Sequence, residues 1–424
     1  MIYPQRIPVM ITKVRGTHDI IDTTIFDFVI KSAIAHFKRA HFHEIITPIL
    51  EPTELFKRSL GAATDVVSKE MFTLNTPQEN DALCLRPEAT ASTMRAFLEH
   101  ANLATPFKVF SHGSMFRHER PQKGRFREFH QFNIEMIGVE SISHDAFLLG
   151  MLDQLFQNIF KLDTYALMIN FLGCFQDREA FKKKLYEFLN AHQNEICQNC
   201  KDRMHKNILR VLDCKTPSCQ ELYRHAPSML ENLCAQCSSE WDILKEQLEV
   251  LSVSYTVNAR LVRGLDYYEK TVFEFASAHL GAQSTFCGGG RYNQLATMLG
   301  SKIDYSSIGA AMGIERLMLL LEPIKDKLLI PQEPALHALM PLSKDQNNLA
   351  LLIADMLFDN GLCIELMFDE SIKSMMRKAN KLGAQYALIL GPEEQEKGIV
   401  TVKTMMTGIE EKIAQRDLIA YLKK

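Results

Sequence analysis

The sequence predicts an α+β protein with a large N-terminal domain built on an antiparallel sheet and a smaller C-terminal α/β domain. Two strand-like runs, at residues 107–119 and 129–138, are joined by a strongly basic loop, and such a pair predicts an antiparallel hairpin. Beyond residue 334, strand-like and helical segments alternate, which is typical of an α/β domain with a largely parallel sheet. Pro323, Pro331 and Pro334 bracket a charged stretch that we interpret as the linker.

The N-terminal domain, residues 1–330, is predicted to begin with an amphipathic helix over residues 22–40, where apolar residues recur at helical spacing. The next segment, HEIITPILEP, is rich in β-branched residues but contains Pro48. Because proline cannot donate to a β-ladder, we expect this strand at a sheet edge or an interface. Pro87 suits the first turn of a helix over residues 87–100, since the N–H that it lacks is not needed there.

Residues from about 175 to 250 change character and are interpreted as an inserted module. Six of the ten cysteines and the only tryptophan, Trp241, fall in this stretch. Strand-like segments return over residues 253–262, 271–277 and 282–292, and a buried helix is predicted after Gly313. We expect these segments to complete the antiparallel sheet of the N-terminal domain.

Composition excludes several classes of protein. Lys and Arg total 48 against 51 Asp and Glu, so there is no overall basic field, and any RNA binding must come from local patches. The sequence has no run of 18 or more uncharged apolar residues, so it predicts no transmembrane helix. The N-terminus also lacks the apolar core of a signal peptide. We therefore expect a cytoplasmic protein with no membrane partner.

No phosphate-binding loop of the GxxxxGK[ST] kind is present, and no GxGxxG lies between a strand and a helix. The phosphates of a bound nucleotide would therefore have to be held by arginines, whose planar forks match phosphate oxygens. For any single arginine, a solvated or salt-bridged surface position is the simpler explanation. The candidates that stand in strand ends, turns or helix starts are Arg117, Arg125, Arg127, Arg263 and Arg316.

Five segments, in order along nearly the whole chain, resemble motifs of the histidyl-tRNA synthetase family within the class II aminoacyl-tRNA synthetases. FRHERPQKGRFREFHQFNIEMIG resembles the second class II motif, and RLVRGLDYYEKTVFEF and GGGRYNQL resemble the two histidine-specific peptides. EIITPILEPTELFKRSLGAATDVVSKEMFTL and GAAMGIERLMLLL resemble the first and third motifs. The resemblance implies a catalytic domain with a six-stranded antiparallel sheet, an anticodon-binding domain over residues 334–424, and a homodimer assembled through the first motif.

The resemblance implies an enzyme that joins L-histidine to AMP, using ATP and Mg²⁺, and then transfers the histidyl group to the 3′ end of tRNA-His. In-line attack of a carboxylate on the α-phosphate needs charge neutralisation and positioning more than a protonatable base. By motif, Arg263 and Arg117 are the catalytic candidates, with Arg117 on the α-phosphate and Arg263 on both the α-phosphate and the substrate carboxylate. The implied ATP-binding set is Arg117, Glu119, Arg125 and Arg316, the last on the γ-phosphate.

The family positions that bind histidine match a further set in this sequence. An ammonium group donates three hydrogen bonds, which suits Glu88, Thr90 and Gln131. A carboxylate and phenols around the imidazole would reject side chains that leave a buried polar group unpaired. For the two tyrosines alone, a strand pair with one ring in the core would be the simpler interpretation. The implied histidine-binding residues are Glu88, Ala89, Thr90, Arg117, Gln131, Glu135, Arg263, Tyr267 and Tyr268.

Contacts with tRNA are implied at two places. Donors in the basic loop would meet the acceptor end, and these are Arg120, Gln122, Lys123 and Arg127. In the C-terminal domain, Lys373, Arg377 and Lys381 share one helix face that suits a phosphate backbone, although a solvated face is the simpler explanation.

The cysteines of the inserted module indicate metal or thiol chemistry, because disulfides are rare in a reducing compartment. Cys197–Cys200 and Cys234–Cys237 have the paired spacing of a four-thiolate zinc site, with Cys214 and Cys219 as further candidates. Such a site would be structural and would stabilise a module with a thin core. The alternative is that reduced cysteines pack as small hydrophobic residues. The resemblance supports neither, because many family members lack these cysteines.

Two positions depart from the family pattern. Asn133 stands where glycine is usual, and asparagine tolerates the left-handed backbone that a glycine suggests. Asn293 replaces a common aspartate, and neither residue is expected to touch a ligand. Two alternatives remain open: a non-catalytic paralogue, either a histidine-pathway regulatory subunit or a tRNA-sensing domain, and a class II synthetase for another amino acid. Intact candidate arginines argue against the first, and the imidazole-pocket residues argue against the second.

Overall fold

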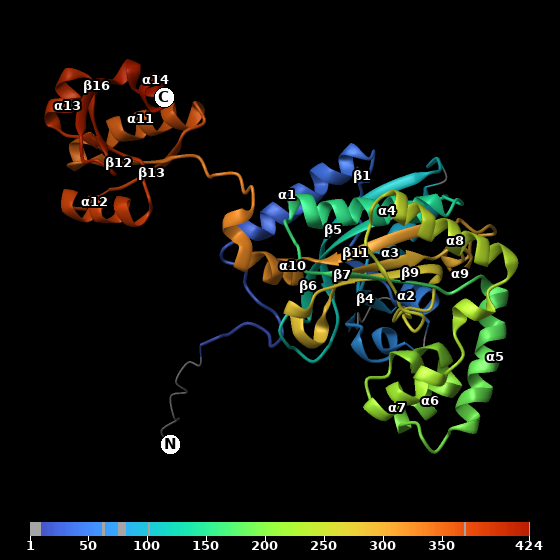
Figure 1. The fold of residues 1–424 in the computed structure, drawn as a ribbon. Helices are drawn as coiled ribbons and strands as arrows, with labels where there is room; N and C mark the ends of the chain where they lie inside the picture. Colours follow the sequence, from blue (N-terminus) through green and yellow to red (C-terminus); the bar gives the residue numbers. More distant parts are fainter. Residues whose placement is uncertain (1–9, 62–63, 75–81, 101, 369, 424) are drawn as a thin grey trace, which may run out of the picture. The chain divides into compact units, whose positions relative to one another are not determined.

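The chain divides into two compact units, Met1–Ile330 and Pro331–Lys424, each with its own sheet (Figure 1). The structure is a computed structural model that describes residues 10–61, 64–74, 82–100, 102–368 and 370–423. Within these residues, no helix has the length and apolar character needed to cross a bilayer.

An eight-stranded sheet organises the larger unit, in the order β1-β5-β6-β11-β10-β9-β7-β8. Two short strands form its edges: β1 (His43–Glu44) pairs in parallel with β5, and β8 (Thr256–Val257) pairs in parallel with β7. The strands between them are antiparallel and agree with the predicted six-stranded sheet. They are β5 (Phe107–Phe116), β6 (Glu128–Ile137), β11 (Ser307–Gly313), β10 (Thr285–Arg291), β9 (Glu269–Ala276) and β7 (Ala166–Phe171).

Helices cover both faces of this sheet (Figure 1). One face packs against α1 (Thr24–Arg39), α4 (Ser143–Gln154), α8 (Ala235–Val250) and α10 (Ile314–Leu321) around the largest hydrophobic core. The other face packs against α2 (Thr53–Leu60), α3 (Thr90–Glu99) and α9 (Leu295–Met298) around a second core. The predicted helices α1 and α10 are confirmed, because their apolar residues recur on the one face that each buries.

Prolines interrupt two predicted elements in this unit. HEIITPILEP forms not one strand but two, because β1 joins the large sheet while β2 (Leu50–Pro52) pairs with β4 (Leu83–Leu85) in a small sheet with β3 (Thr73–Leu74). Pro48 lies in the bend between β1 and β2. Pro87 lies before α3 and not in its first turn, since the helix starts at Thr90 with Ala89 as N-cap. Of the strand predicted over residues 253–262, only β8 forms.

The inserted module follows β7 and is almost wholly helical. It contains α5 (Phe175–Ala191), α6 (Gln198–Lys206), η3 (Ile208–Asp213), α7 (Pro217–Leu222), η4 (Tyr223–His225) and η5 (Met229–Asn232), and it leads into α8. A separate, small hydrophobic core holds it together, and this core includes Cys200, Cys214 and Cys219. Trp241 does not belong to that core, because α8 carries it back against Phe171 in the main one.

The smaller unit has a five-stranded sheet in the order β13-β12-β14-β15-β16. Its strands are β12 (Leu336–Pro341), β13 (Cys363–Leu366), β14 (Tyr386–Leu390), β15 (Ile399–Thr404) and β16 (Glu410–Ala414). The predicted parallel pairing holds for β13, β12 and β14 only, and the rest of the prediction is wrong, because β14–β15 and β15–β16 are antiparallel. The connection from β14 to β15 holds only the short helix α13 (Pro392–Lys397), and a parallel crossover needs a dozen residues or more.

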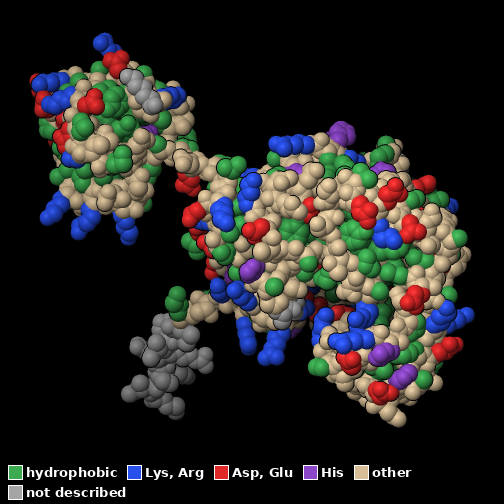
Figure 2. All heavy atoms as spheres, viewed as in Figure 1, with side chains coloured by type: hydrophobic (Ala, Val, Ile, Leu, Met, Phe, Trp, Pro, Cys, Tyr) green, Lys and Arg blue, Asp and Glu red, His purple; other side chains and the backbone are tan. Residues whose placement is uncertain are grey.

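Helices α11 (Asn347–Asp359), α12 (Ile372–Lys381) and α14 (Leu418–Leu422) complete the smaller unit. Figure 2 shows Lys and Arg side chains projecting from the side of this unit where Figure 1 places α12. On α12, Lys373, Arg377 and Lys381 are exposed, and within the described chain none of them forms an ion pair. The helix therefore presents a continuous basic face.

Candidate active site

A cavity of about 350 Å³ opens on the sheet face that carries α3. Strands β6, β10 and β11, the start of α10 and the segment 263–268 contribute to its walls. Most of the residues predicted from sequence line it together: Glu88, Thr90, Arg117, Glu119, Arg125, Gln131, Arg263, Tyr267, Tyr268 and Arg316. Ala89 and Glu135 are fully buried beside it.

The alternation of side chains along β6 explains why this strand supplies so much of the site. Phe132, Ile134 and Met136 point into the main hydrophobic core. Gln131 and Asn133 point to the other face and line the cavity, because successive side chains of a strand face opposite sides. The same strand therefore anchors the domain and presents polar groups to a ligand.

Glu88, Thr90, Glu135 and Tyr292 form a connected polar network at the start of α3. Glu88 accepts the backbone N–H groups of Thr90 at 2.7 Å and Ala91 at 2.9 Å. The Thr90 hydroxyl donates to Glu135 at 2.6 Å, and the Tyr292 hydroxyl donates to the other oxygen of Glu135. Because the N-terminus of a helix favours negative charge, α3 holds Glu88 in position as an acceptor.

Burial dominates the electrostatics of Glu135. Loss of solvent raises its pKa to about 8, the neighbouring Glu88 contributes in the same direction, and the hydrogen bonds from Thr90 and Tyr292 oppose the rise. Without ligand, the carboxyl therefore holds its proton up to roughly neutral pH. Near neutral pH, Glu135 can therefore contact a ligand either as a protonated carboxyl, which donates a hydrogen bond, or as a carboxylate, which accepts one. Such a partner suits an imidazole ring.

Glu135→Gln is expected to remove a pH dependence of stability. A carboxyl whose pKa rises from 4.5 to about 8 on folding binds its proton more tightly in the folded state. The folded protein therefore loses stability as pH rises between these values, by on the order of a few kcal/mol. Urea denaturation from pH 5 to 8 should give a flatter dependence for Glu135→Gln than for the exposed control Glu187→Gln. Equal slopes in the two variants would contradict the assignment.

Tyr267 and Tyr268 are both buried, and their ring centroids lie 4.5 Å apart. The Tyr267 hydroxyl lies 3.5 Å from a Glu88 oxygen. Burial raises the pKa of both phenols, so both remain neutral and keep a proton to donate. The pair therefore belongs to the cavity wall and not to an ordinary strand pair.

Arg117 and Arg316 bring two half-buried cations to the cavity from different elements. Arg117 follows β5, donates through Nε to the Pro87 carbonyl at 2.9 Å and lies 5.4 Å from the Phe129 ring centroid. Arg316, in the first turn of α10, donates through Nε to the Gly124 carbonyl at 3.0 Å. Burial lowers the pKa of both, and for Arg316 the nearby cations lower it further, to about 10. A bound anion would reduce the electrostatic repulsion between cations that converge in this way.

Arg263 is held more firmly than the other cations. Its guanidinium is paired with Glu274 and lies 5.7 Å from the Tyr268 ring centroid. Burial lowers the pKa of Arg263, but the Glu274 carboxylate outweighs burial, so the net shift is upward. A Cβ at Gly288 would lie 2.7 Å from Nη1 of Arg263, so glycine is needed there for the arginine to fit. The result is a fixed charge beside the cavity.

Two models of known protein families match the chain. A family model described as histidyl-tRNA synthetase matches residues 28–317, and one described as an anticodon binding domain matches residues 337–424. The chain belongs to the histidyl-tRNA synthetase family. It is thereby a class II aminoacyl-tRNA synthetase, a ligase, and its smaller unit is an anticodon-binding domain.

Individual members of the histidyl-tRNA synthetase family are similar over almost the whole chain. A histidine–tRNA ligase of Nitratidesulfovibrio vulgaris is 43% identical, and one of Solidesulfovibrio magneticus is 41% identical. Each match covers 97% of this chain and 97% of the relative. The crystal structure of the apo histidyl-tRNA synthetase of Staphylococcus aureus superposes with a TM-score of 0.81 at 31% identity, covering 98% of this chain and all of that one.

The basic loop of the second family motif lies between β5 and β6. Arg120, Gln122 and Lys123 are exposed there. Arg127 instead donates to the Arg15 carbonyl at 3.2 Å, and Arg125 pairs with Glu119. Three of the four residues predicted to meet the acceptor end are therefore free on the surface, whereas Arg127 ties the loop to the N-terminal segment.

A second, larger cavity of about 1170 Å³ adjoins the first. The two share Arg125, Glu274 and Thr285, and the inserted module forms the far wall. Basic side chains outnumber the acidic Asp65, Asp213 and Glu274 in this lining, namely Arg125, Arg203, Arg210, Lys215, Arg224 and Arg260. No local sequence pattern predicts this cavity, because its lining residues are scattered along the chain and only folding brings them together.

Two residues of family motifs behave differently from expectation. Asn133 is not in a left-handed conformation but lies in extended β6, buried and lining the cavity. Within the described residues neither polar atom of its side chain has a hydrogen-bond partner, so it can contact a ligand. Tyr292 is not among the predicted site residues, although it stands in GGGRYNQL directly after β10, which lines the cavity. Asn293 accepts the Ser307 N–H at 3.0 Å and has a structural role.

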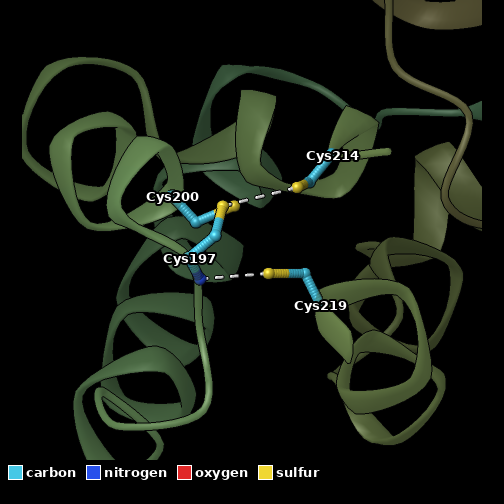
Figure 3. Close-up of side chains that lie close together, drawn as sticks. All are labelled: Cys197, Cys200, Cys214 and Cys219. Carbon is cyan, nitrogen blue, oxygen red and sulfur yellow. Dashed lines mark hydrogen bonds between the residues drawn. The ribbon is translucent and has the colours of Figure 1, made fainter. Parts of the chain in front are cut away.

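The predicted grouping of Cys197, Cys200, Cys234 and Cys237 in one site is wrong. The structure places Cys197 and Cys200 with Cys214 and Cys219 (Figure 3). Cys234 and Cys237 lie instead with Cys174 and Asp177. The physical reason is that Cys234 and Cys237 begin α8, which packs on the main core, whereas the other cysteines close the core of the module.

Proposed function

We propose that the 350 Å³ cavity binds L-histidine and ATP together, makes histidyl-adenylate, and passes the histidyl group to the 3′ end of tRNA-His. The observation that carries this proposal is the convergence of Arg117, Arg263 and Arg316 on the same cavity as the Glu88–Thr90–Glu135–Tyr292 network. One set of groups suits the phosphates, and the other suits an amino acid with a ring of two nitrogens.

Histidine would enter with its ammonium group toward Glu88, Thr90 and Gln131. The Gln131 carbonyl oxygen is buried and, in the described part of the chain, has no partner, which leaves it free to accept from the ammonium. The imidazole would lie against Glu135 and Tyr268, one offering a carboxyl group and the other a phenol. Glutamine, asparagine or phenylalanine would leave at least one of these buried groups unpaired, which costs about 1–3 kcal/mol for each group.

Adenylate formation would depend on the arginines. A histidine carboxylate oxygen attacks the α-phosphorus, the bond to the pyrophosphate oxygen breaks, and pyrophosphate leaves with the electron pair. No proton moves in this step, so a fixed cation serves better than an acid or a base. Arg117 would hold the α-phosphate and Arg316 the γ-phosphate, and Arg263 would hold both the α-phosphate and the attacking carboxylate.

Mg²⁺ would be held mainly by the phosphates and by water. The carboxylates that line the cavity are already engaged: Glu88 by backbone N–H groups, Glu119 by Arg125, Glu274 by Arg263, and Glu315 by His130. Within the described chain the cavity offers Mg²⁺ no cluster of free carboxylates. This fits a small hard cation that keeps several waters and binds through few protein ligands. When bound, Mg²⁺ supplies charge neutralisation on the phosphates. Zinc takes no part in the reaction we propose.

The tRNA would contact the chain at two places. The exposed Arg120, Gln122 and Lys123 and the basic cavity beside the module suit the phosphates of the acceptor end. The anticodon-binding domain suits the other end of the molecule. We place this reaction in the cytoplasm.

A homodimer is part of the proposal. Ile46, Ile49 and Leu50 are exposed around the edge strand β1, in the segment that resembles the first family motif. Three large apolar side chains at an open sheet edge favour contact with another protein surface. A second copy of the chain is the partner that the family resemblance suggests.

The test is amino-acid-dependent exchange of pyrophosphate into ATP, run with the purified chain and each standard amino acid in turn. Histidine alone should support exchange, and tRNA-His should then be charged by the same preparation. A folded protein without exchange would favour the non-catalytic paralogue. Exchange with another amino acid would overturn the assignment of Glu135 and the tyrosine pair to an imidazole.

A further inference from the structure

The four cysteines Cys197, Cys200, Cys214 and Cys219 point toward one another from three separate elements of the module (Figure 3). Cys197 caps α6 and Cys200 lies in its first turn, Cys214 follows η3, and Cys219 lies on α7. All four sulfur atoms lie within 4.8 Å of one another. Folding thus brings together four thiols that span 23 residues of chain, inside the small core of the module.

We propose that these four cysteines bind one zinc ion as a closed, structural site. With Zn–S bonds of about 2.3 Å, a tetrahedron places its sulfur atoms about 3.8 Å apart. The Sγ atoms of Cys197 and Cys214 are 3.7 Å apart, close to that edge length. An iron–sulfur cluster inserts several atoms between its cysteine ligands and spreads them more widely. A single tetrahedral ion therefore fits this cluster better.

Backbone donors around the sulfur atoms support the same assignment. The N–H of Cys197 donates to Cys219 Sγ at 3.2 Å, and the N–H of Thr216 donates to Cys214 Sγ at 3.4 Å. Such bonds stabilise thiolates and orient metal ligands. Four thiolates would fill the tetrahedral coordination sphere of a zinc ion and leave no open position. Three of these cysteines, Cys200, Cys214 and Cys219, are also buried. This is the pattern of a structural site and not of a catalytic one.

A metal here would also fix the module against the catalytic cavity. The segment between Cys200 and Cys214 carries Asn207, which donates to Asp266, and Arg210, which lies 3.3 Å from Asp65. Asp266 directly precedes the tyrosine pair of the proposed histidine pocket. Holding both ends of this segment would therefore hold its contacts with the pocket wall, which goes beyond the proposed reaction itself.

The neighbouring group of Cys174, Asp177, Cys234 and Cys237 provides a matched control. Its carboxylate is already in use, because Asp177 accepts the N–H groups of Cys174 at 3.2 Å and Cys234 at 3.1 Å. Asp177 thus caps two helix starts and is less available to a metal. Cys234 is exposed, so Cys234→Ser changes a thiol in the same module outside the proposed site.

The experiment is metal analysis of the purified full-length chain and its variants. The unchanged chain should carry about one zinc per chain, Cys214→Ser and Cys219→Ser should lose it, and Cys234→Ser should keep it. Replacement by Co²⁺ should give the absorption of a tetrahedral tetrathiolate. A folded, metal-free chain would overturn the proposal, as would iron with sulfide, or zinc that depends on Cys234 and not on Cys214.

A second measurement covers the case in which the serine variants do not fold. In the unchanged chain, a thiol-blocking mercurial should release the zinc in step with the loss of four thiols, and a strong chelator should lower the unfolding temperature. Release of zinc without loss of these thiols would contradict the site. An unchanged unfolding temperature after complete metal removal would contradict its structural role.

Discussion

Arg263→Ala is expected to slow histidine-dependent ATP–pyrophosphate exchange by on the order of a thousandfold. The guanidinium is half-buried beside the cavity and paired with Glu274, so it needs no rearrangement when negative charge gathers on the α-phosphate. Affinity for histidine should fall by less, on the order of tenfold, since only one contact with the substrate carboxylate is lost. Exchange kinetics and calorimetric titration with histidine measure the two effects separately.

Two further variants separate charge from geometry and from folding. Arg263→Lys keeps the charge but loses the planar fork, and it should recover only part of the rate. Arg263→Ala leaves the half-buried Glu274 without its ion-pair partner, so the double variant Arg263→Ala/Glu274→Ala tests whether instability explains the loss. Arg39→Ala, exposed on α1 and outside the lining of both cavities, is the control and should keep full exchange. Equal losses of rate and of histidine affinity in Arg263→Ala would contradict a role in the transition state.

The placement of the candidate site residues in one cavity could be predicted from the sequence where polar residues interrupt an apolar pattern. In β6, Gln131 and Glu135 fall on the face opposite the apolar Phe132, Ile134 and Met136, so strand periodicity places them together. Arg117 and Arg316 likewise stand at the end of a strand and the start of an apolar helix. The resemblance to family motifs then supplied roles for these positions, which remain predictions until tested.

Other features depended on packing that no local pattern encodes. Cys197–Cys200 and Cys234–Cys237 share the same spacing, yet the direction of α8 decides which cysteines meet. Asn133 suggested a left-handed turn by analogy with glycine, but its place in the β6 ladder fixes an extended backbone. The basic cavity beside the module combines residues from distant segments, so only the fold reveals it.

Removing residues 331–424 is expected to lower the efficiency of tRNA charging by on the order of a hundredfold while leaving histidine activation nearly unchanged. The catalytic unit keeps its eight-stranded sheet, its three cores and every residue that lines the proposed histidine and ATP cavity. The anticodon-binding unit has separate cores. A tRNA that binds two linked units gains affinity from both, so the loss of one contact removes that gain without touching the chemistry.

The measurement compares pyrophosphate exchange and tRNA charging in the same preparation of residues 1–330. Exchange serves as the internal control for folding, and light scattering reports whether the proposed dimer persists. The charging defect should shrink as tRNA concentration rises, because the shortened chain still presents the acceptor-end residues Arg120, Gln122 and Lys123. Full charging at low tRNA would show that the smaller unit adds no affinity. Loss of exchange from an intact dimer would instead mean that the smaller unit supports the catalytic site.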